Sequence, residues 1–185
     1  PVELVTPLMR SRAKAVNFGI VYGIGAHSLS QDIGVSYSEA KQYIDDYLRH
    51  YGAVAGFMER MIEEARDKGY AETLFHRRRP LPELQAGNGP TRSFGERVAR
   101  NMPIQGTAAD IIKIAMVRVH KRLREEGLRA RLILQVHDEL IVEAPADEAE
   151  RVSRLLKTEM EAAADLKVRL DVDVHVGTTW YDAKG

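Results

Sequence analysis

The sequence contains no cysteine among its 185 residues. That absence excludes disulfide frameworks and thiolate metal sites, and it fits a reducing cytoplasm, where we expect the protein to reside. Lys plus Arg and Asp plus Glu number 27 each, so net charge gives no argument for or against a polyanionic partner. No apolar run approaches the ~20 residues of a membrane span, so we expect no membrane association.

The length of the chain is that of one domain, enough to bury a core but too short for a large multidomain enzyme. Residue 1 is Pro rather than Met, and a helical pattern follows at once. We therefore expect the sequence to begin inside a longer protein.

The first helix is predicted over residues 7–23, because Thr6 is a good N-cap and Pro7 suits the first helical position. Apolar residues at helical spacing predict a buried stripe formed by Met9, Ala13, Val16 and Ile20. A second row, spaced by four residues, lies on a different face and comprises Arg10, Lys14, Phe18 and Tyr22.

The second row combines two cations with two aromatic rings on a face turned away from the core. Cations followed by a stacking surface suit a nucleoside triphosphate, with charge for the phosphates and a ring face for the base. A solvated face explains the two cations equally well, but it explains an exposed Phe18 beside Tyr22 less readily. The glycines that follow match neither of the Gly-rich phosphate loops, so we interpret them as helix-end residues.

Residues 26–69 are predicted to be helical, with Ser36 or Ser38 as a cap. An irregular basic segment follows a short predicted strand and includes Arg77 and Arg78. These arginines suit phosphate contacts, although a solvated charge run remains an alternative.

A helix is predicted to end or kink at Pro103, and a central apolar helix is predicted over residues 103–126. Three polar side chains spaced by four residues cross this kink: Arg97, Asn101 and Gln105. Such donors suit the acceptors of the DNA minor groove, although surface polarity would explain them as well.

Two apolar runs separated by a short polar tip predict a β-hairpin over residues 131–143. Its tip, His137-Asp138-Glu139, is either a solvated turn or an acidic pair presented to a metal or ligand. A helix over residues 147–164 and a strand over residues 168–176 are predicted to follow. We interpret Asp171, Asp173 and His175 as the solvent-exposed face of that strand rather than as a metal site. This order of elements favours an α+β fold, an antiparallel sheet backed by helices.

Several of these segments resemble one known family. The pattern Arg10-x3-Lys14-x3-Phe18-x3-Tyr22-Gly23 is similar to the fingers helix of family A DNA polymerases, the bacterial DNA polymerase I group. The run from Gln135 to Glu139 is similar to the palm hairpin of that family. The segments 69–79 and 101–106 match as well, so the resemblance covers nearly the whole chain. It implies a helical fingers subdomain over residues 1–90 and the C-terminal part of the palm over residues 91–185.

The resemblance also implies roles for individual residues. Arg10 and Lys14 would hold the triphosphate of an incoming deoxynucleotide, and Lys14 would belong to the catalytic group. Phe18 would pack on the base and sugar, which implies discrimination against sugars lacking a 3′-hydroxyl, and Tyr22 would lie beside the template base. Primer-template DNA would contact a larger set of side chains: Arg77, Arg78, Arg97, Asn101, Gln105 and His137.

In the same family, Asp138 would bind catalytic Mg²⁺ and Glu139 would be a nearby acid of smaller role. Two Mg²⁺ ions would assist attack of the primer 3′-hydroxyl on the α-phosphorus. The family's other metal-binding Asp lies in a motif that this sequence lacks. We therefore expect the chain to need the remainder of a polymerase and to be inactive by itself. The alternatives are a single-subunit RNA polymerase, whose hairpin usually carries Ser in place of Glu139, and a non-catalytic DNA-binding module.

Overall fold

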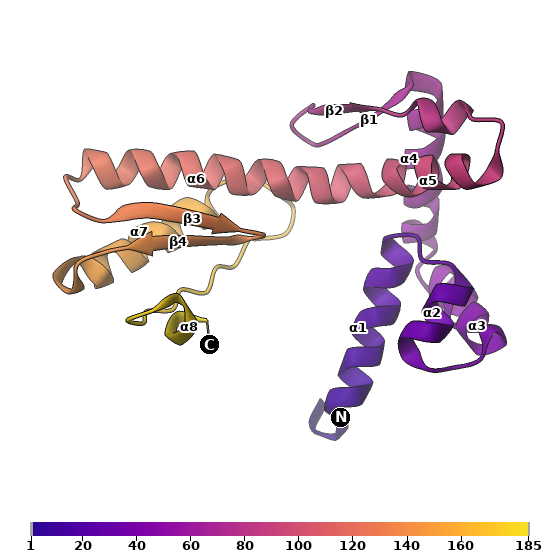
Figure 1. Cartoon of the computed structure of the whole chain (residues 1–185), viewed down its shortest axis with the longest axis horizontal. Helices are drawn as coiled ribbons and strands as arrows, with labels where there is room; N and C mark the ends of the chain where they lie inside the picture. The colour runs from indigo at the N-terminus through magenta and orange to yellow at the C-terminus, as the bar shows by residue number, and fades with distance from the viewer. Residues whose placement is uncertain (1, 185) are drawn as a thin grey trace. The chain divides into compact units, whose positions relative to one another are not determined.

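The computed structural model of the protein describes residues 2–184 and confirms the α+β fold class. Two antiparallel two-stranded sheets accompany the helices (Figure 1). The chain divides between Gly106 and Thr107 into two compact units. No helix among the described residues is both long enough and apolar enough to cross a membrane. The predicted assignment of residues 1–90 to fingers and 91–185 to palm concerns function and stays a prediction.

The first unit begins with a 3-10 turn, Val2–Leu4, and four helices: α1 (Pro7–Val21), α2 (Ala26–Ile33), α3 (Tyr37–His50) and α4 (Gly52–Lys68). Thr6 Oγ1 accepts a hydrogen bond from Met9 N, and Pro7 occupies the first turn of α1, as predicted. Ser36 and Glu39 form a capping box at the start of α3. Local capping chemistry therefore defines where these helices begin.

The buried side of α1 is shorter than predicted. Ile20 is buried and Val16 is half-buried, but Met9 and Ala13 are exposed. The apolar cluster that Val16 joins is built from α2 and α3, with Leu29 at its centre, and it covers only the C-terminal half of α1. The prediction that Met9 and Ala13 are core residues is therefore wrong, because no described element of this unit packs on the first turns of the helix.

The second half of this unit contains β1 (Tyr70–Glu72), β2 (Arg78–Pro80), the 3-10 turn η2 (Pro82–Gln85) and α5 (Gly89–Asn101). Leu81 and Leu84 are buried against α5 and α4. A Cβ atom on Gly95 would lie 3.0 Å from Glu83 Cβ and 3.1 Å from Leu84 N, so glycine permits η2 to pack closely on α5.

The predicted break at Pro103 is a π-helical turn, η3 (Met102–Gly106), which closes the first unit. The long helix that follows, α6, spans Thr107–Glu125, so it starts four residues later than the predicted 103–126. Pro103 has no N–H to donate to an α-helical bond, and a wider turn accommodates the missing donor.

The second unit is built from α6, β3 (Arg131–Val136), β4 (Glu139–Glu143), the 3-10 turn η4 (Ala146–Glu148) and α7 (Ala149–Glu161). The hairpin predicted over 131–143 is confirmed, and the helix predicted over 147–164 is η4 followed by α7. Helices α6 and α7 lie along one face of the hairpin (Figure 1). The core between them includes Val119, Leu123, Val152, Leu155 and Leu156.

The strand predicted over residues 168–176 is wrong. These residues are extended and alternate between half-buried and exposed, and Val174 packs on the core, but they pair with no described strand. A strand needs a neighbour that shares its backbone hydrogen bonds, and periodicity alone cannot supply one. The last described element is a single turn, α8 (Trp180–Ala183).

Candidate functional site

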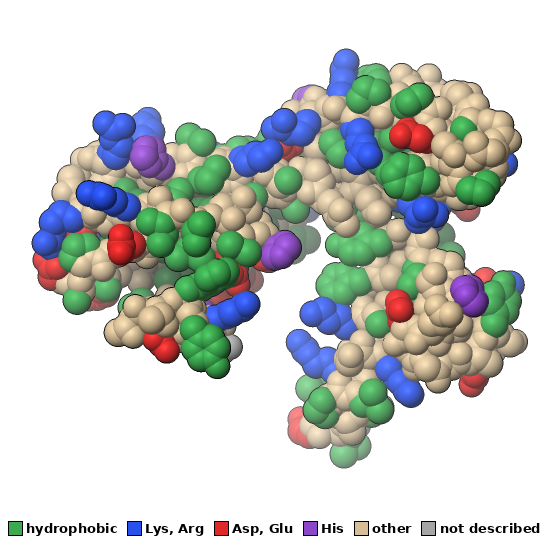
Figure 2. Space-filling view, viewed as in Figure 1, with side chains coloured by type: hydrophobic (Ala, Val, Ile, Leu, Met, Phe, Trp, Pro, Cys, Tyr) green, Lys and Arg blue, Asp and Glu red, His purple; other side chains and the backbone are tan. Residues whose placement is uncertain are grey.

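The predicted row on α1 is exposed to solvent. Arg10 and Lys14 are exposed, Phe18 is 47% exposed, and Tyr22 is half-buried where the helix ends. Figure 2 shows Lys and Arg side chains beside α1. Because the core lies on the opposite side of the helix, around Ile20 and Leu29, this face is available to a ligand.

The side chains of this row contact one another. The rings of Phe18 and Tyr22 lie nearly parallel, with an interplanar angle of 11° and centroids 6.2 Å apart. Lys14 Nζ lies 5.7 Å from the centroid of Phe18, within the range of a cation–π contact. The structure thus brings a cation and two stacked rings together along two turns of one helix.

The predicted arginines of the β1–β2 hairpin differ in their surroundings. Arg78 Nε lies 3.3 Å from Glu72 Oε2, and the Arg78 guanidinium lies 4.6 Å from the centroid of the Tyr70 ring. Arg77 directly precedes β2, and its backbone N–H donates a hydrogen bond to Thr73 Oγ1. The preceding residue, His76, has a φ of 62°, an uncommon value for a residue with a Cβ. Arg78 therefore has a structural role in the hairpin, whatever else it contacts.

The three polar residues predicted to contact DNA lie on α5 and η3. Arg97 is exposed, and its guanidinium lies 5.9 Å from the Phe94 ring centroid. Asn101 is half-buried, and its Oδ1 has no hydrogen-bond partner among the described residues. Gln105 is exposed on the π-helical turn. An orphaned acceptor such as Asn101 Oδ1 is costly to bury, so it points to a partner supplied by a ligand or by water.

The tip of the β3–β4 hairpin is a two-residue loop, His137-Asp138, closed by the pair Val136 and Glu139. His137 has a φ of 51°, whereas Asp138 does not adopt a positive φ. A positive φ at the first loop position alone is the pattern of a type II′ turn, which usually has glycine there. The three side chains of the predicted site, on His137, Asp138 and Glu139, are all exposed.

Two features of this loop escaped the sequence reasoning. Gln135 Nε2 donates to the carbonyl oxygen of His137 at 2.7 Å, which ties the loop to its own strand. The positive φ of His137 stores backbone strain of order 1–2 kcal/mol. The sequence gives only a weak signal for the positive φ, because glycine is the usual residue there, although His is among the other residues enriched at positive φ. The polar Gln135 within an apolar strand was a signal for the loop contact.

The hairpin tip carries donor atoms that suit a divalent metal ion. Asp138 and Glu139 offer adjacent exposed carboxylates, and carboxylate oxygens are the ligands that Mg²⁺ prefers. No group of three or more His, Cys, Asp or Glu side chains suited to a metal occurs within residues 2–184. Mg²⁺ commonly takes one or two carboxylates and completes its shell with substrate phosphates and water. The residues present therefore fit a part of a Mg²⁺ site.

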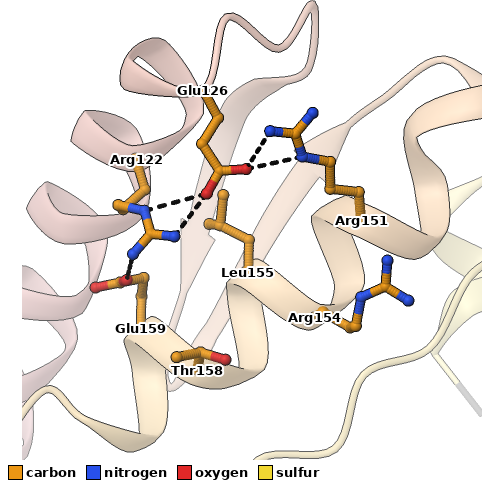
Figure 3. A pocket seen from close by; sticks show the side chains of 7 residues that line it. All are labelled: Arg122, Glu126, Arg151, Arg154, Leu155, Thr158 and Glu159. Carbon is orange, nitrogen blue, oxygen red and sulfur yellow. Dashed lines mark hydrogen bonds and ion pairs between the residues drawn. The ribbon is translucent and has the colours of Figure 1, made fainter.

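A shallow pocket of about 330 Å³ lies between α6 and α7, away from every predicted site residue of its unit. Glu126 accepts hydrogen bonds from Arg122 and Arg151, and Arg122 also reaches Glu159 (Figure 3). Arg154 pairs with Glu150. Because these cations already have carboxylate partners, we interpret the pocket as an ion-pair cluster that joins the two helices.

Comparison with known proteins gave consistent matches. A profile of the family described as DNA polymerase family A matches residues 1–182. DNA polymerase I of Bacillus caldotenax is 56% identical over 180 residues, and the thermostable DNA polymerase I of Thermus aquaticus is 50% identical over 184 residues. The solved POL domain of Pol1 from M. smegmatis, in complex with DNA primer-template and dNTP, superposes with a TM-score of 0.95 at 41% identity.

The matches cover unequal shares of the two partners. They include 97% and 100% of this chain but only 20% and 22% of the Bacillus caldotenax and Thermus aquaticus proteins. The solved POL domain is covered to 33% and this chain to 100%. The chain thus spans about a fifth of the length of these curated relatives.

Proposed function

Because this chain belongs to DNA polymerase family A, we propose that it supplies the nucleotide-binding fingers and part of the catalytic palm of a template-directed DNA polymerase. The observation that carries the proposal is the row on α1, where Lys14, Phe18 and Tyr22 are in contact on a face turned away from the core. The remainder of the polymerase would be provided by further chain, since the relatives are about five times longer.

The α1 row would bind the incoming deoxynucleoside triphosphate. Arg10 and Lys14 are exposed cations one helical turn apart, so both can contact a chain of phosphates. The face of Phe18 would pack on the base and sugar, and Tyr22 would lie at the template side. Lys14 would also stabilise the negative charge that gathers on the leaving pyrophosphate, because its ammonium carries three N–H donors.

The hairpin tip would provide part of the metal site of the palm. Asp138 would bind Mg²⁺, with Glu139 as an accessory carboxylate, and the exposure of both side chains supports this role. Bound Mg²⁺ would supply Lewis-acid stabilisation of the attacking and leaving oxygens in the transfer of a nucleotide to the primer 3′-hydroxyl. Fixing the tip on a two-residue turn would hold the Asp138 carboxylate in one place.

Primer-template DNA would be the macromolecular partner, as it is of the solved Pol1 POL domain. Arg97, Asn101 and Gln105 lie on consecutive helical turns and would contact the primer-template, and His137 would lie at the primer end. Arg77 and Arg78 would contact phosphates. DNA replication or repair in the cytoplasm is the setting that this proposal implies, in keeping with relatives that are DNA polymerase I proteins.

The Asp138 assignment is tested by Asp138→Ala in the polymerase that contains this chain. Removal of a metal-binding carboxylate should lower the rate of primer extension by at least roughly a thousandfold. Because the side chain is exposed, the melting temperature should change little. Primer extension with Mg²⁺ and all four deoxynucleotides measures the first quantity, and thermal unfolding measures the second.

The matched control is Asp147→Ala, an exposed aspartate outside the hairpin whose loss should leave extension unchanged. Near-normal turnover by Asp138→Ala would remove Asp138 from the metal site. The same assay with ribonucleotides and deoxynucleotides in competition measures which sugar the polymerase prefers. Preferential use of ribonucleotides would identify an RNA polymerase instead.

A further inference from the structure

Arg100 on α5 has a half-buried guanidinium without an ion-pair partner among the described residues. Its Nε donates to the carbonyl oxygen of Glu96 at 3.3 Å. The carboxylate of Glu96 is engaged elsewhere, with Oε1 3.2 Å from Arg66 Nη2. A cation in this position loses hydration without gaining a direct ion pair in return, and an anion that it contacted would offset this loss.

The guanidinium of Arg100 lies against the turn that ends α1. A Cβ atom on Gly23 would lie 3.0 Å from Arg100 Nη1 and 3.5 Å from Arg97 Cγ. Gly23 has a φ of 80°, so glycine is favoured there by its backbone as well as by the closeness of both arginines. The guanidinium of Arg100 and the aliphatic stem of Arg97 therefore both lie against the backbone that directly follows Tyr22.

The electrostatics of the pair favour an anion between the side chains. Burial of the guanidinium lowers the pKa of Arg100, Glu96 raises it, and the positive charge of Arg97 lowers it again. Two repelling cations held near each other are relieved by a negative charge that both can contact. Asn101 lies on the same face of α5. Arg97, Arg100 and Asn101 span about 100° of the helix circumference, so they form one polar face.

We propose that Arg100 is a further DNA-binding residue, which joins Arg97 to hold a phosphate of the primer-template beside Gly23. This inference rests on the proposed polymerase function and adds a contact that the resemblance did not assign. The phosphate is distinct from those of the incoming nucleotide. Lys14 lies eight residues before Tyr22, about 12 Å along the helix axis, so a triphosphate held at Arg10 and Lys14 belongs to the first half of α1, away from Gly23.

The test is the salt dependence of primer-template binding by the polymerase that contains this chain. Arg100→Met keeps an unbranched side chain over Gly23 and removes the charge. It should weaken binding by roughly tenfold at low salt. The slope of log K against log salt should become shallower by about 0.7 to 0.9, the change expected for one lost phosphate contact. Arg100→Lys keeps the charge and should retain the wild-type slope.

The matched control is Arg60→Met, the same substitution at an exposed arginine on α4, which should leave the slope unchanged. Melting temperatures of all variants separate a folding defect from a lost contact. If the wild type binds primer-template DNA and Arg100→Met shows the same slope, the inference is overturned. This holds even if the variant binds more weakly, provided that its melting temperature has fallen as well. A larger KM for the deoxynucleotide at saturating DNA, without a change of slope, would place Arg100 on the triphosphate and overturn it too.

Failure of the proposed function has a different signature. A wild-type polymerase that neither binds primer-template DNA nor extends a primer would overturn the function and the inference together. A wild type that binds and extends, beside an Arg100→Met variant with the same slope, overturns the inference alone.

Discussion

At the scale of single residues, Phe18 on α1 is the side chain that we expect to govern which nucleotide sugars are accepted. Phe18 stacks on Tyr22 and is 47% exposed, so a large part of its apolar surface remains in contact with solvent. In the proposed nucleotide site, the face of this ring would pack on the base and sugar, and its edge carries no hydrogen-bonding group. We therefore expect the chemistry at that edge to determine which sugars the site accepts.

Phe18→Tyr should relax discrimination against nucleotides that lack a 3′-hydroxyl. The added phenolic oxygen would offer a hydrogen-bonding group where the missing sugar hydroxyl leaves none, a gain of about 1.5 kcal/mol or roughly tenfold. The ratio of incorporation rates for deoxynucleotides and dideoxynucleotides by the polymerase containing this chain measures the effect. Phe57→Tyr, the same change at an exposed position on α4, is the control and should leave the ratio as it is. An identical ratio in Phe18→Tyr would separate Phe18 from the sugar.

At the scale of elements, the sequence correctly predicted the features that depend on neighbouring residues in the chain. The start of α1 follows from Thr6 and Pro7, and the β3–β4 hairpin follows from two apolar runs around a polar tip. The predictions that failed concerned features that depend on packing or pairing with another element. Met9 was predicted to be buried and residues 168–176 to be a strand, because periodicity states which face is apolar but not whether another element covers it.

The site follows the same division. The exposure of Lys14 and Phe18 on one face could be read from their spacing. The convergence of Arg100 on Gly23 could not, because it joins residues 77 positions apart through tertiary packing. The positive φ of His137 could not be read from the sequence either, because glycine is the residue usually found at such a position. The sequence therefore predicted which of these side chains are exposed, and the structure added contacts and backbone conformations that depend on tertiary packing.

The connection between α6 and β3 depends on a charged anchor. Glu148 on η4 accepts hydrogen bonds from the backbone N–H groups of Arg129 and Ala130 and from Arg129 Nε. The hydrogen bond from Arg129 N is the main cause that lowers the pKa of Glu148 below its ordinary value. A lowered pKa in the folded state means that the ionised carboxylate stabilises the fold above its unfolded pKa, and that this contribution is lost as pH falls.

Glu148→Gln should therefore lower the melting temperature at neutral pH. The difference from the wild type should shrink as the pH falls below the ordinary pKa of a glutamate carboxyl, because protonation of the wild-type carboxylate then removes this contribution. Thermal unfolding across pH 3–8 measures both effects. Glu150→Gln is the control at an exposed neighbouring position and should change the melting temperature little. A destabilisation of Glu148→Gln that stays constant down to pH 3 would show that charge is not its cause.

At the scale of the whole molecule, the chain holds two compact units whose predicted chemistry is complementary. The unit ending at Gly106 carries the cations and rings proposed for the nucleotide, and the unit beginning at Thr107 carries the carboxylates proposed for the metal. Neither set is a complete polymerase site. The described residues offer Asp138 and Glu139 but no third ligand beside them.

The isolated chain should therefore extend no primer in the presence of Mg²⁺ and all four deoxynucleotides. A site that lacks the second metal-binding aspartate cannot stabilise both the attacking and the leaving oxygen. Gel analysis of a labelled primer measures this, with the longer polymerase containing the chain as the positive control. Robust synthesis by the isolated chain, abolished by Asp138→Ala, would show that its own carboxylates suffice.

The sheet of the second unit has a bulge that bears on how copies of the chain behave together. Leu132 pairs with Val142 and Leu134 with Ile141, so Ile133 is an extra residue in β3. Ile133 and Leu134 are about half exposed, and hydrophobic side chains gather over the hairpin in Figure 2. A two-stranded sheet has two open edges, which invite pairing with another chain. The bulge bends β3 and breaks the regular ladder that an incoming strand would need. The bulge at Ile133 thus makes the exposed face and edges of the hairpin a poorer template for pairing with another chain.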